Sequence, residues 1–267
     1  MRIGCHVGMW KGSAPLAEKI AAIGKTGVAG VELFAEDLKP FLADPTPLRA
    51  MVERAALELT GAYLNPKEFL DPAAERAVMD EAAAVCRCLH SLGSEYLVIN
   101  GGPSKGAPPR TFTDADFRRL AAVLNRIGES AAQFDVDVVL HPHWKCQVES
   151  PADVDRLVAA GLDWGKVGLC PHAVHQALIN ADPYAIGEKY ASRVRYVHLG
   201  DCDRAKKAAF LGKGVIDQGR FMKPLLAAGY DGWLVLEGAA EGATPAVYTS
   251  RALAYLHNAF PAVAWED

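Results

Sequence analysis

The feature that most constrains this chain is a regular alternation of short apolar runs with longer segments of helical periodicity. Eight runs rich in Val, Ile and Leu are spaced along the sequence, at residues 2–8, 30–34, 59–64, 96–100, 136–141, 167–170, 194–199 and 233–237. Between them, apolar residues recur at helical spacing, as in Leu120, Val123, Leu124 and Ile127. Uninterrupted apolar strands separated by helices are typical of a parallel sheet that is buried on both faces.

The spacing of these runs favours a closed barrel over an open sheet. Eight strands in 267 residues give about 33 residues per unit of strand and helix, and barrels of eight such units reach about 250 residues as one domain. We therefore predict an α/β fold, a single (β/α)8 barrel domain over residues 1–267. A doubly wound open sheet is the alternative, but no glycine-rich phosphate loop follows the first strand. We accordingly expect no nucleotide cofactor.

Several helix starts carry their own sequence signals. A capping residue followed by proline occurs at Thr46, Asp71, Ser150, Asp182 and Thr244. The cap oxygen accepts a backbone N–H, and proline at the first helical position loses no hydrogen bond because its nitrogen would be unpaired in any case. Thr113 with Asp116 has the pattern of a reciprocal capping pair. Helices are predicted to begin at these places.

Composition and charge narrow the classes of function. The formal net charge is −4, whereas a dedicated nucleic-acid binder normally carries a basic face. No apolar run approaches the roughly 20 residues of a membrane span, and the N-terminal segment MRIGCHVGMW reads as a strand and lacks the apolar stretch of a signal peptide. The six cysteines form no CxxC pair. We expect reduced thiols packed in the core of a cytoplasmic protein.

Histidines are concentrated in one part of the chain, since five of the eight lie between residues 141 and 198. The predicted fifth to eighth strands each end on or near a side chain that can bind a metal, namely His141, His172, His198 and Glu237. In a (β/α)8 barrel the chemistry lies at the C-terminal ends of the strands, so these four groups are expected on one rim. Neutral imidazole and carboxylate bind Zn²⁺, Mn²⁺, Fe²⁺ or Co²⁺. The pattern predicts one divalent metal.

Four segments in the second half of the chain resemble a known family. They are VGLCPHAVHQALINADP, YVHLGDCDR, LGKGVIDQGRF and GYDGWLVLE. Together with the order of the strand-end groups, they resemble the xylose isomerase-like TIM barrels, which include sugar isomerases and epimerases, inosose dehydratase and endonuclease IV. The resemblance is specific over residues 136–238 and extends over the rest of the chain in its rhythm of strands and helices.

The resemblance implies a divalent metal held by side chains on the fifth to eighth strands. The family places a carboxylate, an aspartate, a histidine and a glutamate there, which correspond in this chain to His141, His172, His198 and Glu237. The last two match by type. His141 departs from the epimerase pattern but, with His143, resembles the His-x-His of the inosose dehydratase branch, and His172 stands where an aspartate is usual.

A shell of three histidines and one glutamate favours Zn, Mn, Co or Fe over Mg, which prefers oxygen ligands. Such an ion polarises a carbonyl or hydroxyl group, and the implied substrate is a small keto-sugar or keto-cyclitol. A base then removes a proton α to the carbonyl. Loss of a β-hydroxyl gives dehydration, and return of the proton gives isomerisation or epimerisation. The epimerases use two carboxylates, and one of those positions is His141 here, so we favour dehydration.

The remaining site residues are predicted from their places after the strands. We expect Glu237 to be both ligand and base, with His143 and His175 as acid–base groups near the leaving group. Substrate contacts are predicted for Trp10, Phe34, Asn100, Lys145 and Arg204. Glu32 lies within the second strand, and its position fits either a polar residue of the barrel interior or a substrate contact.

Two other functions compete with a metal-dependent dehydratase. One is a ketose isomerase or epimerase, and the other is a barrel without metal that serves as a binding protein or a subunit of a larger enzyme. A nuclease of the endonuclease IV type needs extra histidines on the third and fourth strands, where this acidic chain has Asn65 and Asn100. No nucleic-acid or membrane partner is expected, and a homo-oligomer is compatible because barrels of this kind often pair.

Overall fold

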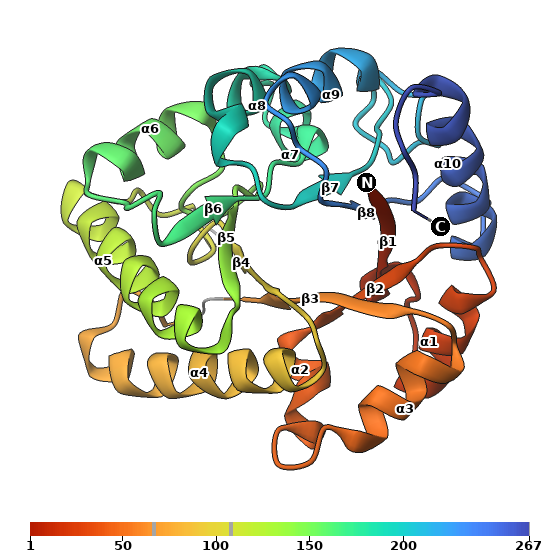
Figure 1. Ribbon diagram of the computed structural model, residues 1–267. Helices are drawn as coiled ribbons and strands as arrows, with labels where there is room; N and C mark the ends of the chain where they lie inside the picture. Colours follow the sequence, from red (N-terminus) through yellow and green to blue (C-terminus); the bar gives the residue numbers. More distant parts are fainter. Residues whose placement is uncertain (66–67, 107–108, 267) are drawn as a thin grey trace.

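The computed structural model describes residues 1–65, 68–106 and 109–266 of the chain. Its centre is a ring of eight parallel strands surrounded by helices (Figure 1). The strands are β1 Arg2–His6, β2 Gly30–Phe34, β3 Glu58–Leu64, β4 Tyr96–Asn100, β5 Asp137–His141, β6 Val167–Leu169, β7 Val197–Leu199 and β8 Trp233–Leu236. The predicted (β/α)8 barrel is confirmed.

Helices follow each strand and form the outer layer of the molecule (Figure 1). The α-helices are α1 Leu16–Gly24, α2 Ala35–Leu38, α3 Thr46–Arg54, α4 Glu75–Ser91, α5 Asp114–Ala131, α6 Pro151–Ala159, α7 Ala173–Leu178, α8 Ala185–Tyr190, α9 Gln218–Ala227 and α10 Pro245–Ala259. Short 3-10 turns lie at Val7–Met9, Lys39–Phe41, Pro72–Ala74, Ala132–Phe134 and Ala191–Arg193. Within the described residues, no helix has the length and apolar character that crossing a membrane requires.

The strands pair in the order β6-β5-β4-β3-β2-β1-β8-β7, and all pairs are parallel. The ring closes between β6 and β7 through an isolated parallel bridge from Leu169 to Val194. Two backbone hydrogen bonds accompany that bridge, from Arg195 to Leu169 (3.1 Å) and from His198 to Pro171 (3.2 Å). The strand predicted at 194–199 is therefore three residues shorter, because its first half is held by a bridge and single bonds instead of a ladder.

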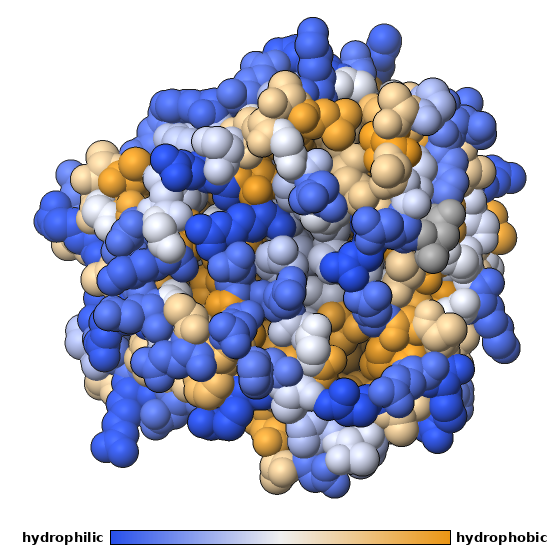
Figure 2. All heavy atoms as spheres, viewed as in Figure 1, coloured by the Kyte–Doolittle hydropathy of each residue, from blue (hydrophilic) through white to orange (hydrophobic). Residues whose placement is uncertain are grey.

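Alternating residues of the strands face two different environments, as the two-residue period of a strand requires. One set packs with the inner faces of the helices and forms the main core, in which Leu97 and Ile99 are fully buried. The other set points into the barrel and forms a smaller cluster that includes Tyr63, Val98 and Tyr196. All six cysteines are unpaired and buried, as predicted for thiols packed in the core. Figure 2 shows hydrophilic side chains over most of the visible face.

The helix starts agree with the capping signals at four of the six predicted places. Ser150 and Thr113 form reciprocal capping boxes, and Asp71 and Thr244 accept a backbone N–H from the first turn. At Thr46 a helix begins as predicted, but Thr46 is not its cap, and the helix start predicted at Asp182 is wrong. Thr46 is itself the first residue of α3 and its N–H is accepted by Asp44, while Asp182 accepts from Tyr184 in a turn that precedes α8.

Candidate active site

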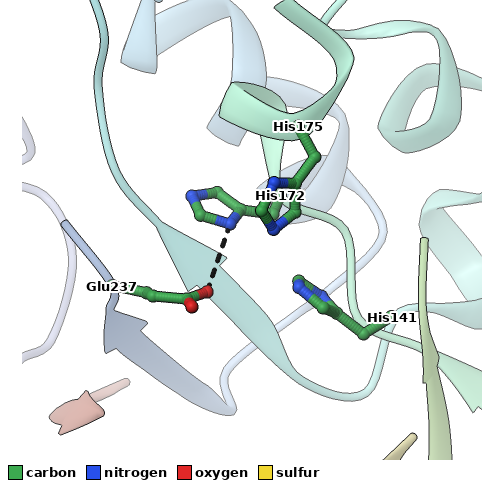
Figure 3. Close-up of side chains that lie close together, drawn as sticks. All are labelled: His141, His172, His175 and Glu237. Carbon is green, nitrogen blue, oxygen red and sulfur yellow. Dashed lines mark ion pairs between the residues drawn. The ribbon is translucent and has the colours of Figure 1, made fainter. Parts of the chain in front are cut away.

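Four side chains that can bind a metal converge at the C-terminal ends of the strands (Figure 3). His141 is the last residue of β5, His172 and His175 lie at the start of α7 after β6, and Glu237 follows β8. One donor atom from each of the four lies within 4.8 Å of the others. Nδ1 of His172 forms an ion pair with Oε2 of Glu237 at 3.4 Å (Figure 3). Loops from three strands thus bring these groups to one point.

Three of these groups, His172, His175 and Glu237, line an open hollow of about 410 Å³. Aromatic, polar and charged side chains line it, among them His6, Phe34, Trp144, His172, His175, Asp201 and Glu237. A hollow of this size at the C-terminal end of a barrel is where such folds bind small molecules.

The hydrogen bonds at the site leave several imidazole nitrogens without a partner. Nδ1 of His141 lies 2.9 Å from the carbonyl oxygen of Cys170. Since a carbonyl only accepts, Nδ1 carries the proton and Nε2 keeps a free lone pair. Among the described residues, this Nε2 and both ring nitrogens of His175 are buried without a hydrogen-bond partner. Buried polar atoms normally find partners, and lone pairs that converge beside a carboxylate fit a divalent cation of the zinc type.

Burial keeps most of these imidazoles neutral. It lowers the pKa of His141 and of His175 well below the ordinary value, and the neighbouring histidines lower it further. The pKa values of His172 and His143 are also lowered by burial. A histidine must be neutral to bind a metal, so these side chains need no proton removed before they can act as ligands or proton acceptors.

His198 is the exception, because it lies between two carboxylates. Its Nδ1 is 3.0 Å from Oε2 of Glu237, and its Nε2 is 2.6 Å from Oε2 of Glu32. Burial alone lowers the pKa of His198, but Glu32 and Glu237 together raise it to about 10. Burial likewise opposes ionisation of Glu237, yet the hydrogen bonds from His172 and His198 hold the pKa of that carboxyl well below its usual range.

The predicted metal ligands are therefore brought together with one additional histidine. His141, His172 and Glu237 belong to the four-residue group, in which His175 takes the fourth place. His198 shares Oε2 of Glu237 with His172 and forms a second close group with His141 and Cys170. The sequence placed His175 among the acid–base groups, and its position one helical turn after His172 is what brings both rings to the same centre.

Two other predicted residues lie at the edge of this group. His143 donates from Nδ1 to the carbonyl of Trp144 (2.8 Å), and its ring centroid is 4.0 Å from that of His175. Phe34 lines the hollow, as predicted for a substrate contact. Its ring packs edge-on against that of His6, with centroids 4.7 Å apart.

The other predicted substrate contacts lie outside this hollow. Trp10 lines a neighbouring hollow between the end of β1 and the start of α10. Asn100 donates to Asn65 (3.0 Å) beside a third hollow after β3 and β4. Lys145 is exposed with its ammonium 4.1 Å from the ring centroid of Trp144, and Arg204 is exposed on the loop after β7. Their roles in substrate binding stay predictions.

The sequence analysis assigns no role to several residues that line the hollow, among them His6, Trp144 and Asp201. His6 is the last residue of β1, and Trp144 follows the predicted site residue His143; those positions are the only sequence signal for either residue. Asp201 accepts four backbone N–H groups of the loop that follows β7, from Cys202, Gly212, Gly214 and Ile216 at 2.9–3.1 Å. This explains the LGKGVID motif: the glycines bring the loop close enough to surround one carboxylate, and the loop then forms a wall of the hollow.

Comparisons with known proteins agree with the sequence resemblance. The inosose dehydratase of Lacticaseibacillus casei is 28% identical over 244 residues, covering 80% of each chain. That of Bacillus licheniformis is 30% identical over 223 residues, covering 74% of this chain and 73% of the relative.

Solved structures of similar fold include sugar epimerases. D-psicose 3-epimerase from Clostridium cellulolyticum H10, solved with D-tagatose, has a TM-score of 0.80 at 18% identity and covers 98% of this chain and 99% of its own. The 3-keto-D-glucoside 4-epimerase of E. coli has a TM-score of 0.75 at 21% identity, covering 97% and 99%. A family model described as the xylose isomerase-like TIM barrel matches residues 20–259. The chain belongs to the xylose isomerase-like TIM barrel family.

Proposed function

We propose that this chain is a metal-dependent dehydratase of a keto-cyclitol or a related keto-sugar. The observation that carries the proposal is the group of buried imidazole nitrogens, without hydrogen-bond partners among the described residues, that converge on Glu237 beside an open hollow. The inosose dehydratases, up to about 30% identical over most of the chain, supply the class of substrate and the reaction. No second carboxylate occupies the four-residue group, which favours dehydration over the two-carboxylate chemistry implied for epimerases.

The residues that would hold the metal are Glu237, His141, His172 and His198, with His175 as the alternative fourth ligand. His198 is preferred because its Nε2 is already bonded to Glu32, which leaves Nδ1 facing the same oxygen of Glu237 that His172 faces. A divalent cation bound there would supply a Lewis acid for a substrate carbonyl or hydroxyl group. The pKa of Glu237, held well below its usual range, makes this residue better suited to binding a cation than to accepting a proton.

Proton transfer is assigned to His175, with His143 beside it. His175 lines the hollow, both of its nitrogens are without partners among the described residues, and its lowered pKa keeps it neutral. In the proposed step, His175 takes the proton α to the carbonyl. The electrons of that C–H bond form the double bond as the β-hydroxyl leaves, and the hydroxide takes the proton from the imidazolium to leave as water. His143 is close enough to share the proton.

The walls of the hollow offer both apolar and charged side chains, which match the C–H groups and the hydroxyl groups of a cyclitol. Phe34 and Trp144 offer apolar ring surface for C–H groups. Lys11 is exposed and lines the hollow, so its ammonium would meet substrate hydroxyl groups. A cyclic polyol presents both kinds of surface, which supports a small unphosphorylated ring as the substrate.

The test combines metal analysis with a turnover assay in D₂O. Protein purified without chelator is expected to contain about one divalent ion per chain, and a keto-cyclitol is expected to lose water. His175→Ala is expected to abolish turnover and leave the circular dichroism unchanged, while His90→Ala, an exposed histidine paired with Asp135, serves as the matched control.

The outcomes separate the competing functions. Deuterium incorporation without loss of water would assign an isomerase or epimerase instead. Protein that contains no metal, and is not stabilised by added Mn²⁺, Co²⁺ or Zn²⁺, would overturn the proposal in favour of a non-catalytic barrel.

A further inference from the structure

Beneath the proposed metal site lies a buried acid that the proposed reaction does not use. Glu32 on β2 points into the barrel and is fully buried. Its Oε2 lies 2.6 Å from Nε2 of His198 and 3.4 Å from the hydroxyl of Tyr196, which is itself bonded to Thr60 at 2.6 Å. A carboxylate removed from water is strongly destabilising unless it is paired. The hydrogen bond to His198 is the shortest of these contacts to Glu32.

The position of this acid decides which nitrogen of His198 faces the site. Because Nε2 is bonded to Glu32 on one side, Nδ1 is directed to the opposite side, where it lies 3.0 Å from Oε2 of Glu237. The ring is also stacked on Tyr63, at a centroid distance of 6.3 Å and an interplanar angle of 18°. The imidazole is thus fixed both in its plane and in its rotation.

We propose that Glu32 is a positioning residue of the metal site, holding His198 by Nε2 so that Nδ1 is presented beside Glu237. The inference rests on the proposed function, and it resolves the two alternatives for Glu32 in favour of the barrel interior. Histidine ligands of metals generally donate their second N–H to a carboxylate or carbonyl, which fixes the tautomer and the ring orientation and makes the nitrogen a stronger ligand. His141 has the same arrangement, with the carbonyl of Cys170 in the place of a carboxylate.

The test removes the charge and then the acceptor, with no large change in side-chain volume. Glu32→Gln keeps an oxygen that can accept from Nε2, whereas Glu32→Leu does not. We expect metal affinity, measured by titration calorimetry with Mn²⁺ and Co²⁺, to fall about 10-fold to 100-fold, more for the leucine variant. The visible absorption spectrum of bound Co²⁺ is expected to change as well, because the orientation of one ligand is lost. Thr249→Val removes another fully buried polar group and is expected to bind as wild type.

Three outcomes are distinguishable when His198→Ala is measured beside these variants. If wild type binds metal, His198→Ala binds it weakly and both Glu32 variants bind as wild type with an unchanged Co²⁺ spectrum, the inference on Glu32 is overturned and the proposed function stands. If wild type does not bind metal, the proposed function fails and the inference fails with it. Weakened binding by both Glu32 variants, at a thermal midpoint close to that of Thr249→Val, supports the inference.

Discussion

Metal binding at Glu237 is expected to release one proton from His198. In the metal-free protein this imidazole bonds to carboxylates through both nitrogens and its pKa is raised to about 10, so it is protonated at neutral pH. A metal bound through Nδ1 must displace that proton. The other three proposed ligands carry no proton that the metal must displace above pH 6.5. Burial lowers the pKa values of His141 and His172, and hydrogen bonds hold the pKa of Glu237 low.

The magnitude follows from the distance between pH and pKa. At pH 7, about three pH units below the pKa of His198, removing the proton costs on the order of 4 kcal/mol, because each unit is worth 1.36 kcal/mol. Affinity for Mn²⁺ should therefore rise about tenfold per pH unit, or roughly 30-fold from pH 7.0 to 8.5. Calorimetric titrations in two buffers of different ionisation enthalpy count the released protons directly, and we expect a value near one.

A count near zero with an affinity that does not change with pH would refute this reasoning. It would mean that His198 keeps its proton and that His175, whose pKa is already low, is the fourth ligand. Two variants separate the cases. His175→Gln should still release one proton, whereas His198→Gln should release none.

Three further predictions follow from contacts at the site. Each carboxylate oxygen of Asp201 accepts two backbone N–H groups, and Asp201→Asn replaces one of these oxygens with an amide nitrogen. We expect the free energy of unfolding, measured with denaturant, to fall by about 3 kcal/mol. An unchanged value would contradict the role given to this carboxylate. A Cβ at Gly200 would lie 2.6 Å from the backbone oxygen of Glu237 and 2.9 Å from Nε2 of His172. Gly200→Ala should therefore weaken Mn²⁺ binding in calorimetry, and wild-type affinity would argue against His172 and Glu237 as ligands. The folded state also lowers the pKa values of His141 and His175, so the unfolded chain binds more protons below pH 6.5. In metal-free protein these two residues alone should cost about 2.7 kcal/mol of stability per unit as pH falls from 6.5 toward those lowered values. The lowered pKa values of His143 and His172 add to this loss, and a flat profile between pH 6.5 and 5 would count against the neutral imidazoles.

The barrel and the rim of the site could be predicted because their signals are local. An apolar run and the residue that ends it are neighbours in sequence, so His141 and Glu237 follow directly from the strands that carry them. The start of a helix is less certain where several side chains can accept the same N–H. Asp44 competes with Thr46 in this way, and the local sequence contains both.

The support for the site could not be predicted because it depends on contacts between distant residues. Glu32 and His198 are 166 positions apart and meet only when β2 and β7 are both built into the ring. Periodicity shows that Glu32 points inward or outward but does not say which residue it meets. The same holds for the cavities, since Trp10 follows β1 and Phe34 ends the neighbouring β2, and yet they line different hollows.

The bridge between β6 and β7 gives the barrel a seam, and the site lies across it. His141 and His172 come from one side of the seam, whereas His198 and Glu237 come from the other. A cation bound by ligands from both sides would hold β6 and β7 together where only an isolated bridge joins them. Local opening of the barrel between β6 and β7 would then be coupled to metal binding. Hydrogen exchange at the amides of Arg195 and His198, which bond across this junction, should become slower when metal is bound.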